Sequence, residues 1–301
     1  MKRIVLKQVF FWAALMFSAG SVMAADEILK PFVLGSKSAG TVAEKSAQVK
    51  AALVAGGFTV VGEYSPYADA AILVVTNDAL KKNAADSEHG GFGAIQRVSI
   101  TQAKGEVQVS YTNPVYMANV YRMKDDLSGV ASSLATTLGK VEEFGAKGMT
   151  AKQARKYHYM IGMEYFDEPD VLAEFASHEE AVRAVDTKLT AKKNGVSKVY
   201  RVDLPGKKES VFGVAMKGIT DADKSMDDRF IMSEIDFREI HSTAHLPYEV
   251  LVADKKVYAL YARFRIAISF PDLSMMGKNS FMNIMKSPDA IRDVLKKTIQ
   301  E

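Results

Sequence analysis

This 301-residue chain contains no cysteine, and that absence excludes several kinds of chemistry. Disulfides, thiolate catalysis, cysteine-ligated metals and a lipid-modified N-terminal cysteine all need the missing side chain. An exported chain of this composition must therefore obtain its stability from its core. Tryptophan is nearly absent as well, because the only one, Trp12, lies in the first 24 residues.

A hydrophobic run long enough to span a bilayer, roughly 20 residues, is also missing. Residues 9–17 form a shorter apolar run, which follows a basic start and precedes small residues at positions 22–24. This order is typical of a Sec-type signal peptide at residues 1–24. We therefore expect a periplasmic mature chain that begins near Ala25, with no lipid anchor and no transmembrane segment.

Net charge is absent from the expected mature chain. The full sequence has 39 Lys and Arg against 36 Asp and Glu, and loss of Lys2, Arg3 and Lys7 leaves 39 − 3 = 36 of each sign. A neutral protein has no long-range field that would attract nucleic acid or anionic lipid. The sequence thus predicts no nucleic-acid partner.

The sequence does contain an internal repeat, in which one order of predicted helices and strands occurs twice. In the first copy, residues 41–57 predict a helix, residues 58–64 and 70–76 predict strands, and residues 97–101 and 106–111 predict a hairpin. Asn113 and Pro114 then predict a helix cap and first turn, which open a short helix over residues 115–123. A further helix follows, with Val130, Leu134, Leu138 and Val141 on one face.

The second copy repeats this order from a helix at residues 179–194. Strands are expected at residues 197–204 and 210–216, a hairpin at residues 248–261, a strand leading into Pro271, and a final helix after Ser287. Gly57 and Gly195, which end the two first helices, are 195 − 57 = 138 residues apart. We expect a first domain at residues 28–138, a linker at residues 139–157 and a second, divergent domain at residues 158–299.

Three stretches carry a resemblance to a known family: GGFTVV at residues 56–61, VSYTNPVYMANVY at residues 109–121 and LPYEVLVADKKVYALY at residues 246–261. They resemble the domain of unknown function 302 (DUF302), whose structures are called TT1751-like. The resemblance implies an α+β fold: two similar two-layer α/β units, each an antiparallel-rich sheet with helices packed on one face. It also implies frequent self-association, and it supplies no established reaction and no catalytic residues.

Histidines 241 and 245 are the candidate metal ligands. On a helix their four-residue spacing would place both imidazoles on one face, where a divalent metal could join them. Two ligands leave the coordination shell incomplete unless Glu234, Asp236 or Glu239 contributes. The alternative interpretation is a polar loop with two solvent-facing histidines. No other cofactor is predicted, because the sequence lacks phosphate-loop, calcium-loop and serine-nucleophile spacings.

Tyrosine and methionine are concentrated in two short segments that have more apolar residues than one helix face needs. The candidate ligand or interface residues are Tyr111, Tyr116, Met117 and Tyr121 in the first copy and Met275, Met276 and Phe281 in the second. Methionine suits irregular partners because its side chain is flexible. The partner could be the chain's own core, the equivalent helix of the other copy, a second subunit in a homodimer, or a small ligand.

Three functions remain open on this sequence. The first is a non-catalytic periplasmic module that binds a small apolar or amphipathic ligand. The second is a structural protein that self-associates or docks to an envelope partner through its Tyr/Met helices. The third is a metal-binding protein or hydrolase that depends on His241 and His245.

Overall fold

The structure is a computed structural model that describes residues 27–160 and 162–301. The expected signal peptide lies outside the described residues. The described part confirms an α+β fold with antiparallel sheets and helices packed against them.

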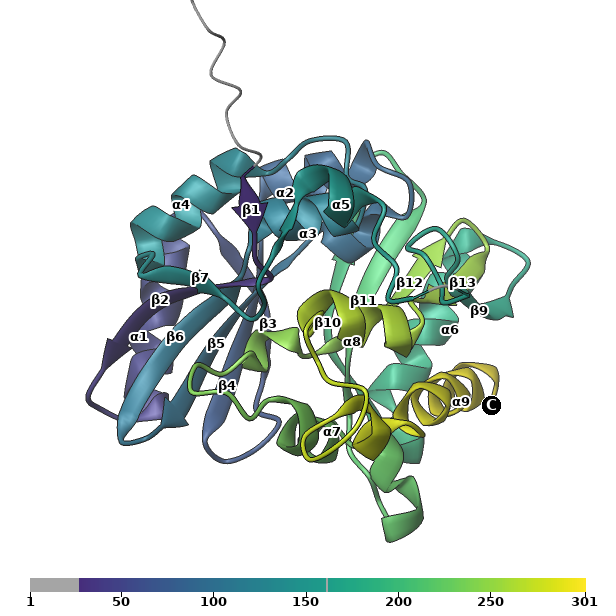
Figure 1. Ribbon diagram of the computed structural model, residues 1–301. Coiled ribbons are helices and arrows are strands. Elements are labelled where there is room, and N and C mark those ends of the chain that lie inside the picture. The colour runs from purple at the N-terminus through teal and green to yellow at the C-terminus, as the bar shows by residue number, and fades with distance from the viewer. Residues whose placement is uncertain (1–26, 161) are drawn as a thin grey trace, which may run out of the picture.

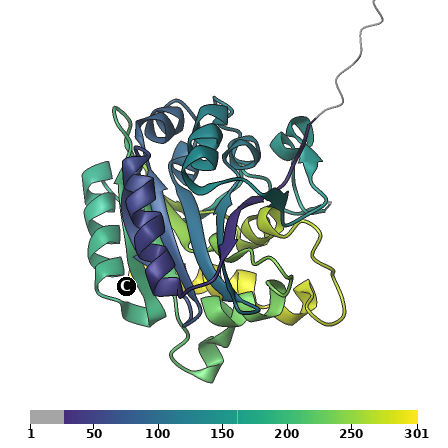
Figure 2. The ribbon, with the colours of Figure 1, turned by 90° about the vertical axis from the view of Figure 1, so that its left-hand side faces the viewer.

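The first half of the chain forms a six-stranded sheet with strand order β3-β4-β5-β6-β2-β7 (Figure 1). Its elements are β1 (Ile28–Leu29), β2 (Phe32–Ser38), α1 (Val42–Ala55), β3 (Thr59–Tyr64), β4 (Ala70–Thr76), α2 (Asp78–Ala85), the 3-10 helix η1 (Gly90–Gly93), β5 (Gln96–Ala103), β6 (Glu106–Thr112), α3 (Pro114–Val120), α4 (Ser128–Leu138), β7 (Glu142–Phe144), β8 (Met149–Thr150) and α5 (Ala151–Arg155). Helices α1 and α4 pack together on this sheet, and Figure 2 shows α1 lying in front of the strands. Asn113 caps α3 directly before Pro114, as its sequence predicts.

The second half forms a five-stranded sheet with strand order β10-β11-β12-β13-β9. Its elements are β9 (Asp170–Glu174), α6 (His178–Thr190), η2 (Lys193–Gly195), β10 (Val196–Asp203), β11 (Glu209–Met216), η3 (Asp221–Met226), α7 (Asp228–Ile235), η4 (Thr243–His245), β12 (Tyr248–Ala253), β13 (Lys256–Ala259), α8 (Ala262–Ser269), η5 (Phe281–Ile284) and α9 (Ser287–Gln300). Helices α6 and α9 pack together on it, as α1 and α4 do on the first sheet. No described helix is long and apolar enough to cross a membrane.

The two halves repeat one another element by element. The series β2-α1-β3-β4-α2-η1-β5-β6-α3-α4 corresponds to β9-α6-β10-β11-α7-η4-β12-β13-α8-α9, and the five shared strands have the same order in both sheets. Strand pairing places Gly62, Val74 and Arg97 side by side on three neighbouring strands of the first sheet. The equivalent residues of the second sheet, in the same order, are Tyr200, Gly213 and Glu249. We call the two halves the first and second repeats.

Equivalent residues of the two repeats meet each other. Arg97 and Glu249 form a buried ion pair, and a Cβ placed on Gly62 would lie 2.8 Å from the Cβ of Tyr200. The repeats also make reciprocal contacts. In the first repeat, η1 lies against β11 and β12 of the second, and in the second repeat, η4 lies against β4, β5 and β6 of the first. The repeats are therefore related by an approximate two-fold axis that passes near these pairs.

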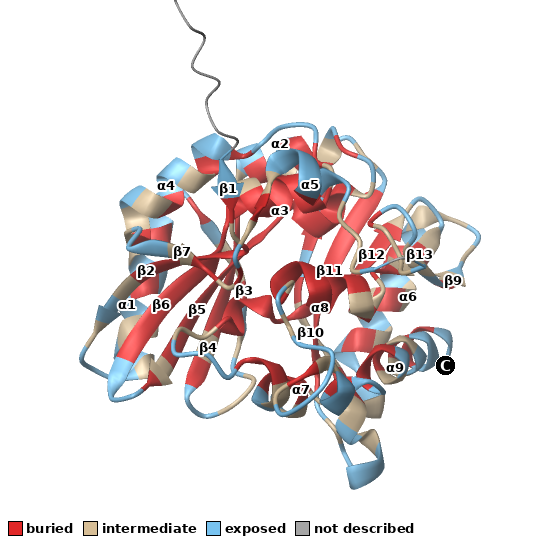
Figure 3. Cartoon of the chain, in the orientation of Figure 1, coloured by how far each residue is buried: buried red, intermediate tan, exposed pale blue. Residues whose placement is uncertain are grey.

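This arrangement buries both faces of the central strands. Along β5, Val98 and Ile100 alternate with Ser99 and Thr101, and all four are buried. Figure 3 shows the strands at the centre of the molecule coloured mostly as buried. Thr101 Oγ1 donates to Thr243 Oγ1 of the second repeat at 3.0 Å, so the polar face of β5 faces the other repeat. An alternation that usually marks a solvated sheet face here marks an interface between repeats.

Two sequence predictions of structure are wrong. Val141, expected on one helix face with Leu138, lies beyond the end of α4 and is 65% exposed. The segment before Pro271, predicted as a strand, is the helix α8. Because α8 follows the hairpin β12-β13 as α3 follows β5-β6, α8 is the true counterpart of the Tyr/Met helix, and the Met-rich segment beyond it is a loop with the short η5. The segment predicted as a linker contributes β7, β8 and α5, so it is folded onto the first repeat.

Candidate functional site

The first-repeat Tyr and Met candidates lie in the core. Tyr111, Tyr116, Met117 and Tyr121 are each no more than 2% exposed. Tyr111 donates to the carbonyl of Gly139 at 3.0 Å. Helix α3, which carries Tyr116 and Met117, is therefore packed inside the molecule and presents no open groove at these side chains.

The contact of Tyr116 crosses between the repeats. Its hydroxyl donates to the carbonyl of Ile268 in α8 at 2.8 Å. The ring of Phe166 lies between the repeats as well, with its centroid 5.5 Å from that of Tyr121 and 6.3 Å from that of Phe264. The aromatic side chains of the α3 segment thus pack against the second repeat of the same chain.

The second-repeat candidates lie elsewhere, near the surface. Met275 is 38% exposed and Met276 is 72% exposed. Phe281 lines an apolar crevice with Tyr159 and Phe270, but the crevice has a volume of only about 10 Å³. It has no room for an organic ligand, so the Tyr and Met candidates do not converge on one ligand groove.

The two candidate histidines do not share a helix face. His245 ends the three-residue η4 and is buried, with Nδ1 lying 2.9 Å from Ser269 Oγ and 3.0 Å from a guanidinium nitrogen of Arg265. Burial and the two nearby arginines lower the pKa of His245 well below its usual value. His241 is partly exposed and lies 3.4 Å from Asp236. Within residues 27–160 and 162–301, no group of three or more His, Asp and Glu side chains could hold a metal ion.

A buried charge cluster holds the repeats together next to His245. Arg97, Glu249 and Arg265 are each 1% exposed. One carboxylate oxygen of Glu249 pairs with Arg97, and the other lies 3.1 Å from Nε of Arg265. Arg265 also donates to the carbonyl of His245. This cluster is sealed from solvent, so its role in the described structure is to join β5, β12 and α8.

A cleft that could admit a ligand lies between the repeats, beside His241. It has a volume of about 320 Å³, which is within the usual range for small-molecule sites. The loop between β3 and β4 supplies one wall and α7 with the segment that follows it supplies the other. The residues that line it are Tyr67, Ala68, Asp69, Arg229, Met232, Ser233, Asp236 and His241. We call it the inter-repeat cleft.

Hydrogen bonds fix the inner end of this cleft. Asp236 accepts from the backbone N–H of Ser242 at 2.8 Å, and the hydroxyl of Tyr67 lies 3.1 Å from that of Thr243. The Asp236 carboxylate raises the pKa of His241 above its usual value, against the opposing effect of partial burial. The contact with Asp236 therefore favours the protonated form of His241 over that of a free imidazole.

The outer end of the inter-repeat cleft carries charges of both signs. Arg229 is exposed on α7, and Asp69 is exposed on the opposing loop. Together with a protonated His241, they offer a ligand both cationic and anionic partners. Of these side chains the sequence suggested His241 and Asp236. Tyr67, Asp69 and Arg229 were missed, because they are far from His241 along the chain or carry no local motif.

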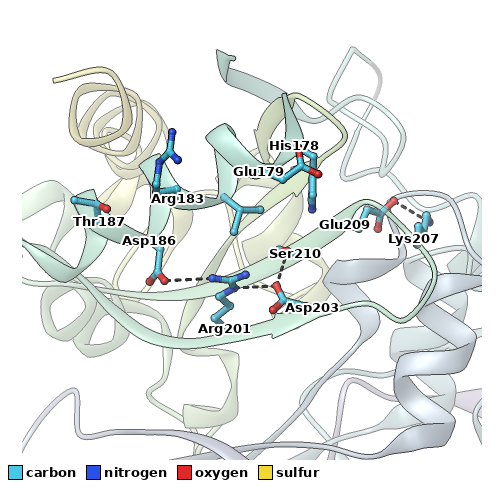
Figure 4. Close-up of a pocket in the computed structure, with 11 residues that line it drawn as sticks. His178, Glu179, Arg183, Asp186, Thr187, Arg201, Asp203, Lys207, Glu209 and Ser210 are labelled. Carbon is cyan, nitrogen blue, oxygen red and sulfur yellow. Dashed lines mark hydrogen bonds and ion pairs between the residues drawn. The ribbon is translucent and has the colours of Figure 1, made fainter. Parts of the chain in front are cut away.

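A second polar cleft, of about 410 Å³, lies between α6 and the β10-β11 hairpin (Figure 4). Its central charges are already paired with one another. Arg201 contacts Asp203 at 2.8 Å and Asp186 at 3.3 Å, and Ser210 donates to Asp203 at 2.6 Å. All of these residues belong to the second repeat. We call it the α6 cleft.

Comparison with protein-family models, with curated proteins and with solved structures found no match to this chain. The resemblance to DUF302 remains a prediction from the sequence, and the assignment of function depends on the chain's own geometry.

Proposed function

We propose that this chain is a non-catalytic binding protein of the periplasm and that its small ligand lies in the inter-repeat cleft. The observation that carries the proposal is the cleft itself: about 320 Å³, bounded by both repeats, with His241 held by Asp236 at its inner end. Clefts between domains are a common place for small-molecule sites. A fixed pair of repeats can hold such a cleft open with little rearrangement.

The lining of the cleft favours a polar ligand over the apolar one expected from the Tyr/Met pattern. Arg229 and a protonated His241 suit a carboxylate or another anionic group, and Asp69 suits an ammonium or hydroxyl group. Charge-assisted hydrogen bonds of this kind are among the stronger contacts available to a small ligand. A compact molecule that carries both charges, such as an amino acid, fits this set best.

Two other functions remain alternatives. The His241–Asp236 contact is the observation that favours an acid–base hydrolase, because a carboxylate beside an imidazole can orient it as a base. Self-association through α3 has less support, because Tyr116, Met117 and Tyr121 are already buried within the chain.

The test starts with the mature chain recovered from the periplasm. Its mass measures whether residues 1–24 are removed, and native mass spectrometry detects any small molecule that co-purifies. Thermal melts with the twenty amino acids and a set of dicarboxylates then search for a ligand that raises the melting temperature. A chain that keeps its leader would contradict export, and a chain with no bound mass and no response to these probes would contradict ligand binding.

Variants locate the site. Arg229→Ala should weaken binding of any responding compound by roughly 10- to 100-fold, the equivalent of one charged hydrogen bond. His241→Gln should weaken it less at high pH than at low pH, because only the protonated imidazole carries charge. The control is Arg183→Ala, an exposed arginine of the α6 cleft, which should leave binding unchanged. Loss of binding in the Arg183 variant alone would move the ligand to the α6 cleft. Turnover of an ester probe that disappears in His241→Gln would favour the hydrolase.

A further inference from the structure

Exposed methionine is concentrated in one loop of the second repeat. Methionine side chains are usually buried, yet four that lie between positions 275 and 285 are exposed. These are Met275 at 38%, Met276 at 72%, Met282 at 47% and Met285 at 55%. By contrast, Met117, Met123, Met216, Met226 and Met232 are each no more than 3% exposed.

Backbone hydrogen bonds bring three of these methionines together. The N–H of Met282 donates to the carbonyl of Met275 at 3.1 Å, which folds the loop back on itself. The N–H of Met285 donates to the carbonyl of Met282 at 3.4 Å. Met282 lies in η5 and Met285 follows three residues later, a spacing that places side chains on the same side of a 3-10 turn. The loop thus gathers Met275, Met282 and Met285 although they span eleven positions.

One thioether is oriented by a neighbouring side chain. The hydroxyl of Tyr159 donates to Sδ of Met275 at 2.7 Å. The ring of Tyr159 also packs beside Phe281, with ring centroids 6.2 Å apart, and both rings line the narrow apolar crevice beneath the loop. Since a thioether sulfur has two lone pairs, a sulfur that accepts from Tyr159 retains one for another partner.

Thioether sulfur is a soft and uncharged ligand, and among metal ions it selects Cu(I) and the chemically similar Ag(I). It does not suit Zn²⁺, Mg²⁺ or Ca²⁺, which favour imidazole, thiolate or oxygen ligands. Unlike a thiolate, a thioether cannot be lost to disulfide formation in an oxidising compartment, and this chain has no cysteine. Nearby negative charge is also present, because Asn283 of the same loop donates to the Glu234 carboxylate at 2.8 Å.

We propose that Met275, Met282 and Met285 form a binding site for a soft monovalent cation, Cu(I) or Ag(I), with the three sulfur atoms as ligands. The flexible methionine side chains close around the ion, and the Tyr159–Phe281 pair supports the loop from below. This site is separate from the inter-repeat cleft and does not depend on the function proposed for it.

Ag(I) is the probe for the test, because it is soft and stable in air. The mature chain is labelled with ¹³C on the methionine methyl groups and titrated with Ag(I), and the methyl resonances are followed by NMR. One equivalent should shift the resonances of Met275, Met282 and Met285 and leave those of buried Met117 and Met232 in place. Mg²⁺, a hard cation that binds oxygen ligands, is the control and should shift none of them. Equal shifts at buried and exposed methionines, or no shift at one equivalent, would overturn the proposal.

Leucine variants test two of the three ligands separately. Methionine and leucine have similar volumes, so Met282→Leu and Met285→Leu should fold normally, as melting temperatures will show. Each should weaken Ag(I) binding on the order of tenfold or more, since even indirect partners of a metal ligand have effects of about that size. Met276→Leu, the matched control at the neighbouring position, should change affinity less than twofold. If Met276→Leu weakens binding as much as Met282→Leu does, the assignment of these three ligands is wrong.

Discussion

Replacement of Glu249 by glutamine should destabilise the protein by roughly 3–5 kcal/mol, the usual effect of breaking a buried ion pair from one side. Glu249 is the only carboxylate in direct contact with both Arg97 and Arg265 within the described chain, and all three side chains are about 1% exposed. Glutamine keeps the shape but removes the charge. Two guanidinium groups would then remain buried without a counter-charge.

Loss of the Glu249 charge should destabilise the two buried guanidinium groups to different extents. Arg265 keeps other acceptors, because it donates to the carbonyl of His245 and lies 3.2 Å from Ser269 Oγ. Nε of Arg97 has no hydrogen-bond partner among the described residues, so Arg97 depends on Glu249. Arg97→Met in the Glu249→Gln background should therefore recover about 2 kcal/mol, because it removes the cation that has lost its partner.

Urea unfolding of the mature chain at pH 7 measures both effects through the midpoint and slope of the transition. Glu63→Gln is the matched control, because Glu63 pairs with Lys50 at 2.6 Å on the surface and should contribute less than about 1 kcal/mol. The reasoning fails if Glu249→Gln costs less than about 1 kcal/mol. It also fails if adding Arg97→Met makes that variant less stable.

Two further predictions concern residues that lie near the contact between the repeats. Burial raises the pKa of Asp228 to about 7 although Tyr64 and the Met216 N–H donate to it, so the folded state holds a proton that the unfolded state releases near pH 3.8. The protonated Asp228 carboxyl should therefore stabilise the protein most below about pH 4, and roughly 4 kcal/mol of that stability should be lost as the pH rises to 7. Asp228→Asn should remove this loss. Parallel profiles of unfolding free energy against pH for the natural chain and the variant would contradict the prediction. Gly213→Ala should lower stability by about 1–3 kcal/mol, because the new Cβ would lie 2.0 Å from the Tyr200 ring. Tyr200→Leu should relieve much of that loss, and a melting temperature for Gly213→Ala equal to that of the natural chain would contradict the packing argument.

Sequence patterns predicted the elements whose signals are local. The apolar run at residues 70–76 corresponds to β4, and the Asn113-Pro114 cap opens α3 as expected. These features depend on strand burial and helix capping, which need only a few neighbouring residues. The repeated order of elements is visible for the same reason.

The prediction failed where packing between the repeats decides the structure. The strand predicted before Pro271 was inferred from the residues AISF at positions 267–270 and from their likeness to the SYTNP stretch of the first copy. The chain there forms the helix α8, with seven of its eight residues buried, and Arg265 is satisfied by Glu249 from another strand. A charged residue that is buried by a distant partner cannot be recognised from local periodicity.

The inter-repeat cleft could not be predicted from the sequence for a related reason. Tyr67 and His241 come from different repeats, and the sequence contains no motif that links them. The histidine pair attracted attention through its spacing, but the structure buries His245 and leaves His241 beside Asp236. Only the three-dimensional arrangement separates a structural histidine from one that a ligand could reach.

Equivalent residues of the two repeats contact each other near the two-fold axis, and these contacts limit which partner each repeat can pair with. In a symmetric dimer of one repeat, Arg97 would face a second Arg97, or Glu249 a second Glu249, and like charges would be buried together. Likewise, Tyr200 now lies against Gly62, and two tyrosines in those places would collide. Each repeat is thus shaped to pair with the other repeat and not with a copy of itself. Separately produced halves should recognise each other in preference to themselves, so a break in the connecting segment would leave a heterodimer and not two self-sufficient copies.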